Sequence, residues 1–176
     1  MGKIIVAVDA MGGDNAPYEI IKGSIEAAKE FNINIVLVGQ EEVIKENLKR
    51  FRYDESSISI LNASEVIGTD EVPTTAIRRK KDSSMVVGLK YVKDGNADAF
   101  VSAGSTGALL TGATVIIGRI KGIERPVLGT RLPGRHGYTF LVDCGANVDC
   151  KPQYLVQFAK MGYVYTKYVL GVNDPK

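Results

Sequence analysis

Histidine and cysteine are scarce in this sequence: among 176 residues only His136, Cys144 and Cys150 are of these types. A structural zinc site usually takes four such ligands at short spacings, which these residues cannot supply. The cysteine count and the lack of a secretory n-region and h-region point to a reducing cytoplasm. Cys144 follows a strand beside Asp143 and could pair with a histidine as a nucleophile, but a small buried cysteine is the commoner case. His136 lies in a glycine-rich link and is expected to face solvent.

The motifs of nucleotide-binding loops are also missing, because neither GxGxxG nor GxxxxGK[ST] follows a predicted strand. This disfavours a nucleotide-dependent dehydrogenase or kinase. The chain also lacks a large excess of charge of one sign, since it has 22 Lys and Arg residues and 20 Asp and Glu residues. A net charge of +2 gives no indication of a nucleic-acid partner. The uncharged run 99–118 has transmembrane length, but its four glycines and five Ser or Thr residues favour a buried strand–loop–helix unit.

Strand-like and helix-like patterns alternate along the chain. The strand-like runs are 3–8, 33–38, 57–62, 97–102, 127–132 and 138–143, and the helical patterns are 17–31, 41–51, a segment opening at 82–84, 108–117 and 154–170. Near-continuous apolar strands fit a parallel sheet covered on both faces, so the rhythm predicts a doubly wound α/β fold. The short link 133–137 predicts a hairpin and hence at least one antiparallel strand.

The expected domain organisation is one α/β unit over residues 1–176. The tail 171–176 resembles a helix end followed by a turn, at the point where a further strand is expected. The sequence therefore predicts that the chain is the N-terminal part of a longer protein.

Three loops of one design follow predicted strands, at 8–15, 101–108 and 142–149. Each contains small residues and then side chains of the helix-capping type. In a parallel sheet all three would leave the same edge and converge on one cleft. Taken singly, each loop has a local explanation, in which Ser105 or Thr106 caps a helix and the glycines allow tight packing. Three such loops on one edge favour a shared ligand site.

The middle loop is the best phosphate candidate because it has two glycines, two hydroxyls and no acid before a helix start. Unpaired N–H groups at a helix start attract anions. Gly104, Ser105, Thr106 and Gly107 are therefore predicted to bind phosphate.

Acidic side chains mark the other two loops and would repel a bare phosphate there. Asp9 and Asp143 end their strands, where they could transfer protons, hold a metal or brace the loop by accepting N–H bonds. Asp14, Asn15 and Asn147 are more simply explained as helix caps. The residues predicted to shape these loops are Gly12, Gly13, Asp14, Asn15, Gly145 and Ala146. Nothing in the spacing demands a metal, and none is predicted.

The run Arg78-Arg79-Lys80-Lys81 is the strongest charge cluster of the chain. Cations suit the C-terminal end of a helix, so a solvated helix end explains much of it. Such a cluster could also attract an acidic partner protein over a distance.

Four segments in order resemble one family: 9–17 (DAMGGDNAP), 78–85 (RRKKDSSM), 102–109 (SAGSTGAL) and 143–152 (DCGANVDCKP). The chain is similar over essentially its whole length to the N-terminal half of bacterial phosphate acyltransferases of the PlsX type. Two positions depart from the family's usual residues. Ser105 stands where Asn is usual, which keeps a polar group in the loop, and Cys144 stands where Val is usual, which argues against a nucleophilic role.

The resemblance implies a three-layer α/β/α fold like that of isocitrate and isopropylmalate dehydrogenases and phosphotransacetylases. It implies transfer of an acyl group from acyl carrier protein to inorganic phosphate for phospholipid synthesis, without a cofactor, by a cytoplasmic homodimer. Peripheral membrane association through a downstream acyltransferase is a further implied possibility. Phosphate is itself a nucleophile, so the site need only hold it, aim it and stabilise the oxyanion.

Within that reaction the catalytic group is expected to be Asp9, Asp143 and Asn147. The two acids would orient loops or handle protons, and the 145–147 backbone would donate to the oxyanion. Residues 78–81 would dock the acidic carrier protein. Two alternative functions stay open: a nucleotide-dependent enzyme of the same architecture, and a non-catalytic anion-binding or assembly fragment.

Overall fold

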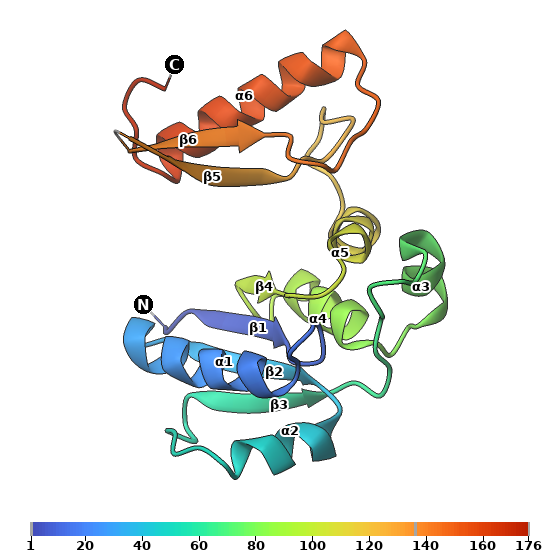
Figure 1. Cartoon of the computed structure of the whole chain (residues 1–176), viewed down its shortest axis with the longest axis vertical. Coiled ribbons are helices and arrows are strands. Elements are labelled where there is room, and N and C mark those ends of the chain that lie inside the picture. The colour runs from blue at the N-terminus through green and yellow to red at the C-terminus, as the bar shows by residue number, and fades with distance from the viewer. Residues whose placement is uncertain (1, 136, 176) are drawn as a thin grey trace. The chain divides into compact units, whose positions relative to one another are not determined.

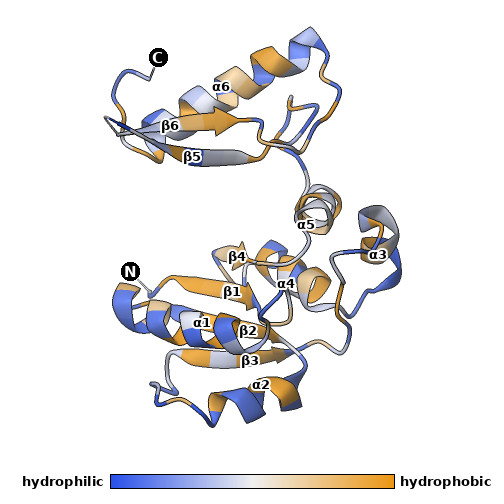
Figure 2. Ribbon diagram, viewed as in Figure 1, coloured by the Kyte–Doolittle hydropathy of each residue, from blue (hydrophilic) through white to orange (hydrophobic). Residues whose placement is uncertain are grey.

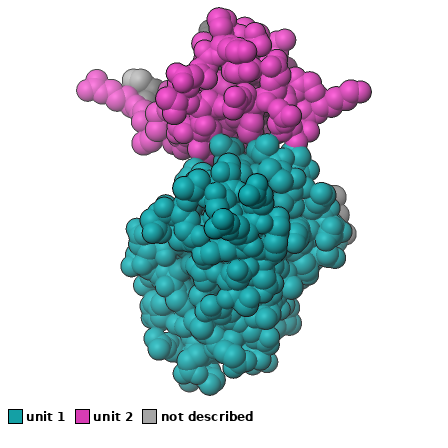
Figure 3. All heavy atoms as spheres, turned by 90° about the vertical axis from the view of Figure 1, so that its right-hand side faces the viewer, with its two compact units in different colours: residues 1–118 teal, residues 119–176 magenta. Residues whose placement is uncertain are grey.

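The computed structural model describes residues 2–135 and 137–175, in two compact units formed by residues 1–118 and 119–176 (Figures 1 and 3). The expectation of a single α/β unit over residues 1–176 stays a prediction. The expected solvent exposure of His136 lies outside the described residues.

The first unit is built on a four-stranded parallel sheet with the order β3-β2-β1-β4. The strands are β1 (Ile5–Asp9), β2 (Asn34–Gly39), β3 (Ile58–Asn62) and β4 (Ala99–Val101). Because β1 and β4 are paired in parallel, with Val8 opposite Val101, the loops that follow them leave the same edge of the sheet. The predicted parallel sheet is therefore confirmed, with strand ends shifted by one or two residues.

Helices cover both faces of this sheet and give it three layers. On one face, α1 (Tyr18–Phe31) and α2 (Glu41–Leu48) bury Ile21 and Ile44 against Leu37 of β2. On the other face, α4 (Ser84–Lys93) packs Val87 and Tyr91 against the opposite side chains of β1 and β2. Figure 2 shows the matching pattern, with apolar strands and polar outer helix faces. Successive side chains of β2 point to opposite faces of the sheet, so every second residue packs against the helices of the same layer.

Three helical details differ from the sequence-based expectation. A short helix, α3 (Pro73–Arg79), begins at a proline in its first turn, and only its basic end was predicted. The expected helix 108–117 is α5 (Thr106–Gly112) followed by a wider π-helical turn at Ala113–Ile117. The periodicity of residues 17–31 predicts Phe31 on the apolar stripe of this helix, but its side chain is 64% exposed because Phe31 is the last residue of α1.

The second unit consists of the hairpin β5 (Gly129–Gly134) and β6 (Gly137–Val142), followed by α6 (Pro152–Tyr168). The hairpin is antiparallel, as the 133–137 link predicted, and it forms a separate two-stranded sheet. α6 packs on β6, with the Phe140 and Tyr165 rings stacked at 4.9 Å between centroids. None of the helices in the described residues is both long and apolar enough to span a membrane.

Candidate functional site

The first two loops meet at the carboxylate of Asp9, which is 2% exposed at the end of β1. Its Oδ1 accepts the N–H of Met11 at 3.2 Å, and its Oδ2 accepts the hydroxyl of Ser102 at 2.8 Å. The Ser102 oxygen in turn accepts the N–H of Gly104 at 3.1 Å. The buried acid therefore joins the loop after β1 to the loop after β4.

Close backbone contact between these loops explains the glycine pair of the first one. A Cβ atom on Gly12 would lie 2.4 Å from Asp9 Oδ2 and 3.1 Å from the Gly104 nitrogen. Gly13 has a φ of +110°, which L side chains rarely adopt, and it faces Ala103 of the second loop. The predicted loop-shaping role of Gly12 and Gly13 fits this geometry.

The predicted phosphate loop leads into α5, and Ser105 is the N-cap of that helix. Its hydroxyl accepts the N–H of Ala108 at 3.3 Å, so the local capping explanation holds for this side chain. Gly104 donates its N–H to Ser102 and is committed within the loop. Among the described residues, the N–H groups of Thr106 and Gly107 have no acceptor. These two exposed residues are where an anion would find donors.

The start of α3 lies beside this loop. A Cβ atom on Gly107 would lie 2.9 Å from Cγ of Pro73, which is the first residue of α3. The basic residues Arg78 and Arg79 occupy the last turn of the same helix.

Lys80 differs from its basic neighbours. Its amine donates to Glu71 Oε1 and to the Val66 carbonyl, both at 2.6 Å, and so holds the segment before α3. Glu71 accepts from Lys80 and also from the Gly68 N–H, and these bonds lower the pKa of its carboxyl. The prediction that residues 78–81 act alike therefore needs refinement: Arg78, Arg79 and Lys81 are exposed, whereas Lys80 is tied into the fold.

The predicted capping role of Asp14 and Asn15 is wrong. α1 has Pro17 as its N-cap residue and no side-chain cap. The chain first makes a turn in which the Ala16 N–H donates to the Gly13 carbonyl, so both side chains precede the helix start and are exposed.

The third loop belongs to the second unit, and Asp143 braces it. Its Oδ1 accepts the Leu128 N–H at 2.8 Å, and its Oδ2 accepts the Asn147 N–H at 2.7 Å. Burial raises the pKa of the Asp143 carboxyl, but the bonds from Leu128, Asn147 and Ala146 outweigh this effect, so the net pKa lies below its usual range. A carboxylate with these donors is a structural anchor for the loop.

Asn147 does not cap α6, whose N-cap residue is Lys151. Its side-chain amide donates instead to the Pro126 carbonyl at 3.0 Å and to Asp143 Oδ2 at 3.2 Å. The backbone amide of Asn147 is likewise committed to Asp143, whereas the Gly145 amide of the expected oxyanion group has no acceptor among the described residues. The convergence of all three loops on one cleft stays a prediction.

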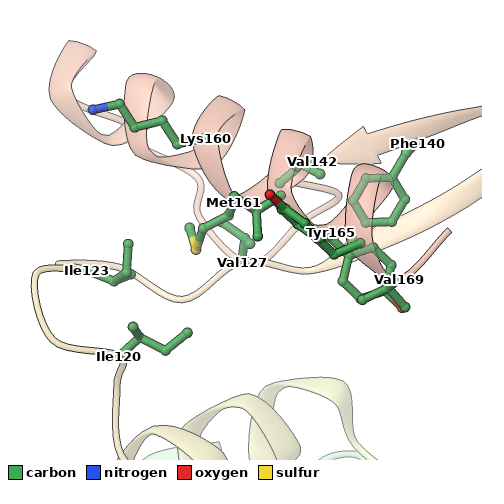
Figure 4. A pocket seen from close by; sticks show the side chains of 13 residues that line it. Ile120, Ile123, Val127, Phe140, Val142, Lys160, Met161, Tyr165 and Val169 are labelled. Atoms are coloured by element: carbon green, nitrogen blue, oxygen red, sulfur yellow. The ribbon is translucent and has the colours of Figure 1, made fainter. Parts of the chain in front are cut away.

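A groove in the second unit is unsuited to phosphate because its lining is almost wholly apolar (Figure 4). Ile120, Val127, Phe140 and Met161 are among its lining residues, and Lys160 is the one charged residue that lines it. Within residues 2–135 and 137–175, no group of three or more His, Cys, Asp or Glu side chains could hold a metal ion.

Proteins with sequences similar to this chain include two phosphate acyltransferases. A phosphate acyltransferase of Clostridium kluyveri is 55% identical over 172 residues, which are 98% of this chain and 52% of that protein. One of Clostridium botulinum is 56% identical over 173 residues, again 98% of this chain and 52% of the relative. The chain thus spans about half the length of the curated relatives it matches.

The fold is shared with a solved phosphotransacetylase of Streptococcus pyogenes, at a TM-score of 0.65 and 22% identity. That similarity covers 89% of this chain and 51% of the solved one. Residues 4–176 match the family described as "Fatty acid synthesis protein". Because this match extends over nearly all of the sequence, the chain belongs to the fatty acid synthesis protein family.

Proposed function

We propose that the full-length protein carrying this chain is a phosphate acyltransferase that moves an acyl group from acyl carrier protein to inorganic phosphate. The observation that carries this proposal is the start of α5, where Thr106 and Gly107 have uncommitted N–H groups in the described structure beside two interlocked loops. The similarity to relatives named phosphate acyltransferase supports it. The acyl phosphate product would feed phospholipid synthesis.

The proposed reaction needs no nucleophile from the protein, because phosphate is itself the nucleophile. The site has to bind phosphate and orient it toward the thioester carbonyl. A phosphate oxygen attacks the thioester carbonyl, and the carbonyl oxygen becomes an oxyanion. Collapse of this intermediate breaks the C–S bond, so acyl phosphate forms and the carrier thiolate leaves and takes up a proton. Backbone N–H groups that hold the phosphate in place supply the entropic part of the acceleration.

The contacts favour positioning roles for the expected catalytic residues. Asp9 is buried with Met11 and Ser102 as partners, and Asp143 and Asn147 bond to each other and to the backbone around them. We therefore assign loop orientation to all three residues in preference to proton transfer. Gly145 keeps the proposed role of donor to the oxyanion.

The double variant Ser105→Ala with Thr106→Ala tests the phosphate site in the full-length enzyme. We expect its KM for phosphate to rise about tenfold, the equivalent of roughly 1.4 kcal/mol. The variant removes the Ser105 hydroxyl that holds the Ala108 N–H and fixes the first turn of α5, together with the Thr106 hydroxyl beside the two uncommitted N–H groups. Acyl phosphate trapped with hydroxylamine gives the rate. Ser83→Ala, which removes the comparable N-cap of α4, controls for loss of a helix cap. An unchanged KM in the double variant would contradict the phosphate assignment.

We also propose that the exposed cations Arg78, Arg79 and Lys81 dock the acidic carrier protein. They lie in the same unit as the phosphate loop, and the first residue of α3 contacts that loop. Arg78 lies five residues beyond Pro73, a rise of roughly 8 Å along the helix. Cations about this far from the phosphate loop bind the acidic carrier protein close enough for its acyl group to reach the loop.

Charge reversal by Arg79→Glu with Lys81→Glu should raise the KM for the acyl carrier protein. The effect should be larger at low than at high ionic strength, because salt screens exposed charges. Lys80→Met serves as the contrast, since it should lower stability through loss of the Glu71 bond while leaving the salt dependence unchanged. Equal loss at both salt concentrations would reject the docking surface.

Homodimer formation, a cytoplasmic location and contact with the membrane through a downstream acyltransferase complete the proposal. A nucleotide-dependent enzyme is disfavoured by the loop sequences, and a nicotinamide titration tests it. A non-catalytic anion-binding role would be separated from catalysis by comparing this chain with the full-length protein.

A further inference from the structure

We propose that Ser102 is a positioning residue of the phosphate site, whose hydroxyl transmits the fixed position of Asp9 to the loop before α5. This inference rests on the proposed function, because it gives Ser102 a part in phosphate binding. Asp9 and Ser102 are separated by 93 residues and meet because β1 and β4 are parallel neighbours.

The contacts of Ser102 have a defined direction. The hydroxyl donates its single proton to Asp9 Oδ2 at 2.8 Å, and its oxygen then accepts the N–H of Gly104 at 3.1 Å. A side chain must donate and accept at one atom to make both bonds. Alanine at this position would leave the Gly104 N–H and one oxygen of a buried carboxylate without these partners.

The position of Asp9 is itself fixed. The side chain is 2% exposed, and its other oxygen accepts the Met11 N–H. A Cβ atom on Gly12 would meet Oδ2 at 2.4 Å, so the carboxylate lies tightly against the first loop. Ser102 is bonded to a group that has little room to move.

The hydrogen bonds from Asp9 through Ser102 to Gly104 form a relay. Its end at Gly104 sets the shape of the phosphate loop. A Cβ atom on Gly104 would lie 3.2 Å from the Cα of Gly12, so its backbone is held against the first loop. Its N–H is used by Ser102, and the Ala108 N–H is used by Ser105. The donors left for an anion in this loop include those of Thr106 and Gly107, and their placement follows from the anchored Gly104 before them.

Three variants of the full-length protein test the role: Ser102→Ala, Ser102→Thr and, as a matched control, Ser57→Ala. Ser57 directly precedes β3, and its hydroxyl donates to the Asp54 carbonyl at 2.8 Å, at the end of the sheet opposite to the phosphate loop. Calorimetric titration with inorganic phosphate should show about tenfold weaker binding by Ser102→Ala, the equivalent of roughly 1.4 kcal/mol. Ser102→Thr should recover most of the affinity, and Ser57→Ala should bind as wild type.

Amide hydrogen exchange at Gly104 provides the second readout. Its protection should fall in Ser102→Ala and return in Ser102→Thr. Phosphate binding by Ser102→Ala at wild-type affinity would overturn the role of Ser102 while leaving the proposed function intact. Failure of the wild-type full-length protein to bind phosphate would overturn both, and retained Gly104 protection in Ser102→Ala would overturn the relay alone. If Ser102→Ala does not fold, Ser102→Cys, which keeps the size but donates weakly, replaces it.

Discussion

Gly12→Ala is expected to destabilise the first unit by about 1–3 kcal/mol and to weaken phosphate binding about tenfold. The added Cβ would lie 2.4 Å from Asp9 Oδ2 and 2.9 Å from its Cγ, so the carboxylate must move. Movement of the carboxylate strains its bond to Ser102 and displaces Gly104. Urea unfolding and phosphate titration measure the two effects.

Gly23→Ala is the matched control for this prediction. Gly23 is an exposed residue inside α1, and a Cβ there would meet nothing within 4 Å. Alanine should therefore raise stability by about 0.5–1 kcal/mol through its helix propensity and leave phosphate binding unchanged. A Gly12→Ala chain as stable as wild type, with unaltered phosphate affinity, would contradict the interlocked-loop account.

Asp143→Asn should disorder the third loop at a cost of about 1–2 kcal/mol. The carboxylate accepts the N–H groups of Leu128 and Asn147 on different oxygens, and an amide can replace only one of these acceptors. The NH2 group then faces a donor. Hydrogen-exchange protection of the Leu128 and Asn147 amides measures the loss, and the exposed Asp149→Asn in the same loop is the control.

The pH dependence of this bracing follows from the lowered pKa of Asp143. A carboxyl whose pKa is lower in the folded state contributes stability above its unfolded pKa and loses it as pH falls through the folded pKa. Protection of the Leu128 and Asn147 amides should therefore fall on acidification in wild type, below the usual carboxyl range. In Asp143→Asn the same protection factors should already be low at neutral pH and change little, and a wild-type-like acid response in this variant would reject the explanation.

The parallel sheet and its covering helices could be predicted from sequence because local periodicity determines them. Apolar runs such as 34–39 fit strands buried on both faces, and the spacing of Met85, Val86 and Leu89 fits one buried helix face. The short glycine-rich link gave the hairpin. α3 was missed because its seven residues, beginning Pro-Thr-Thr, carry too little apolar periodicity.

The site was only partly predictable, because roles depend on contacts between distant residues. The placement of the 102–107 loop at the edge of the sheet followed from the prediction of a parallel sheet, but the partnership of Ser102 with Asp9 depends on the β1–β4 pairing. Asp143 has the residue type of an acid catalyst, and only its donors identify it as a brace. Lys80 is likewise indistinguishable from its basic neighbours in sequence.

The central claim is that phosphate binds at the start of α5, and amide chemical shifts of this chain during titration with inorganic phosphate test it most directly. We predict saturable shifts of the Thr106 and Gly107 amides, with little change at Ser57 at the opposite end of the strands. Unchanged Thr106 and Gly107 amides at saturating phosphate, or saturable shifts confined to other parts of the chain, would contradict the claim.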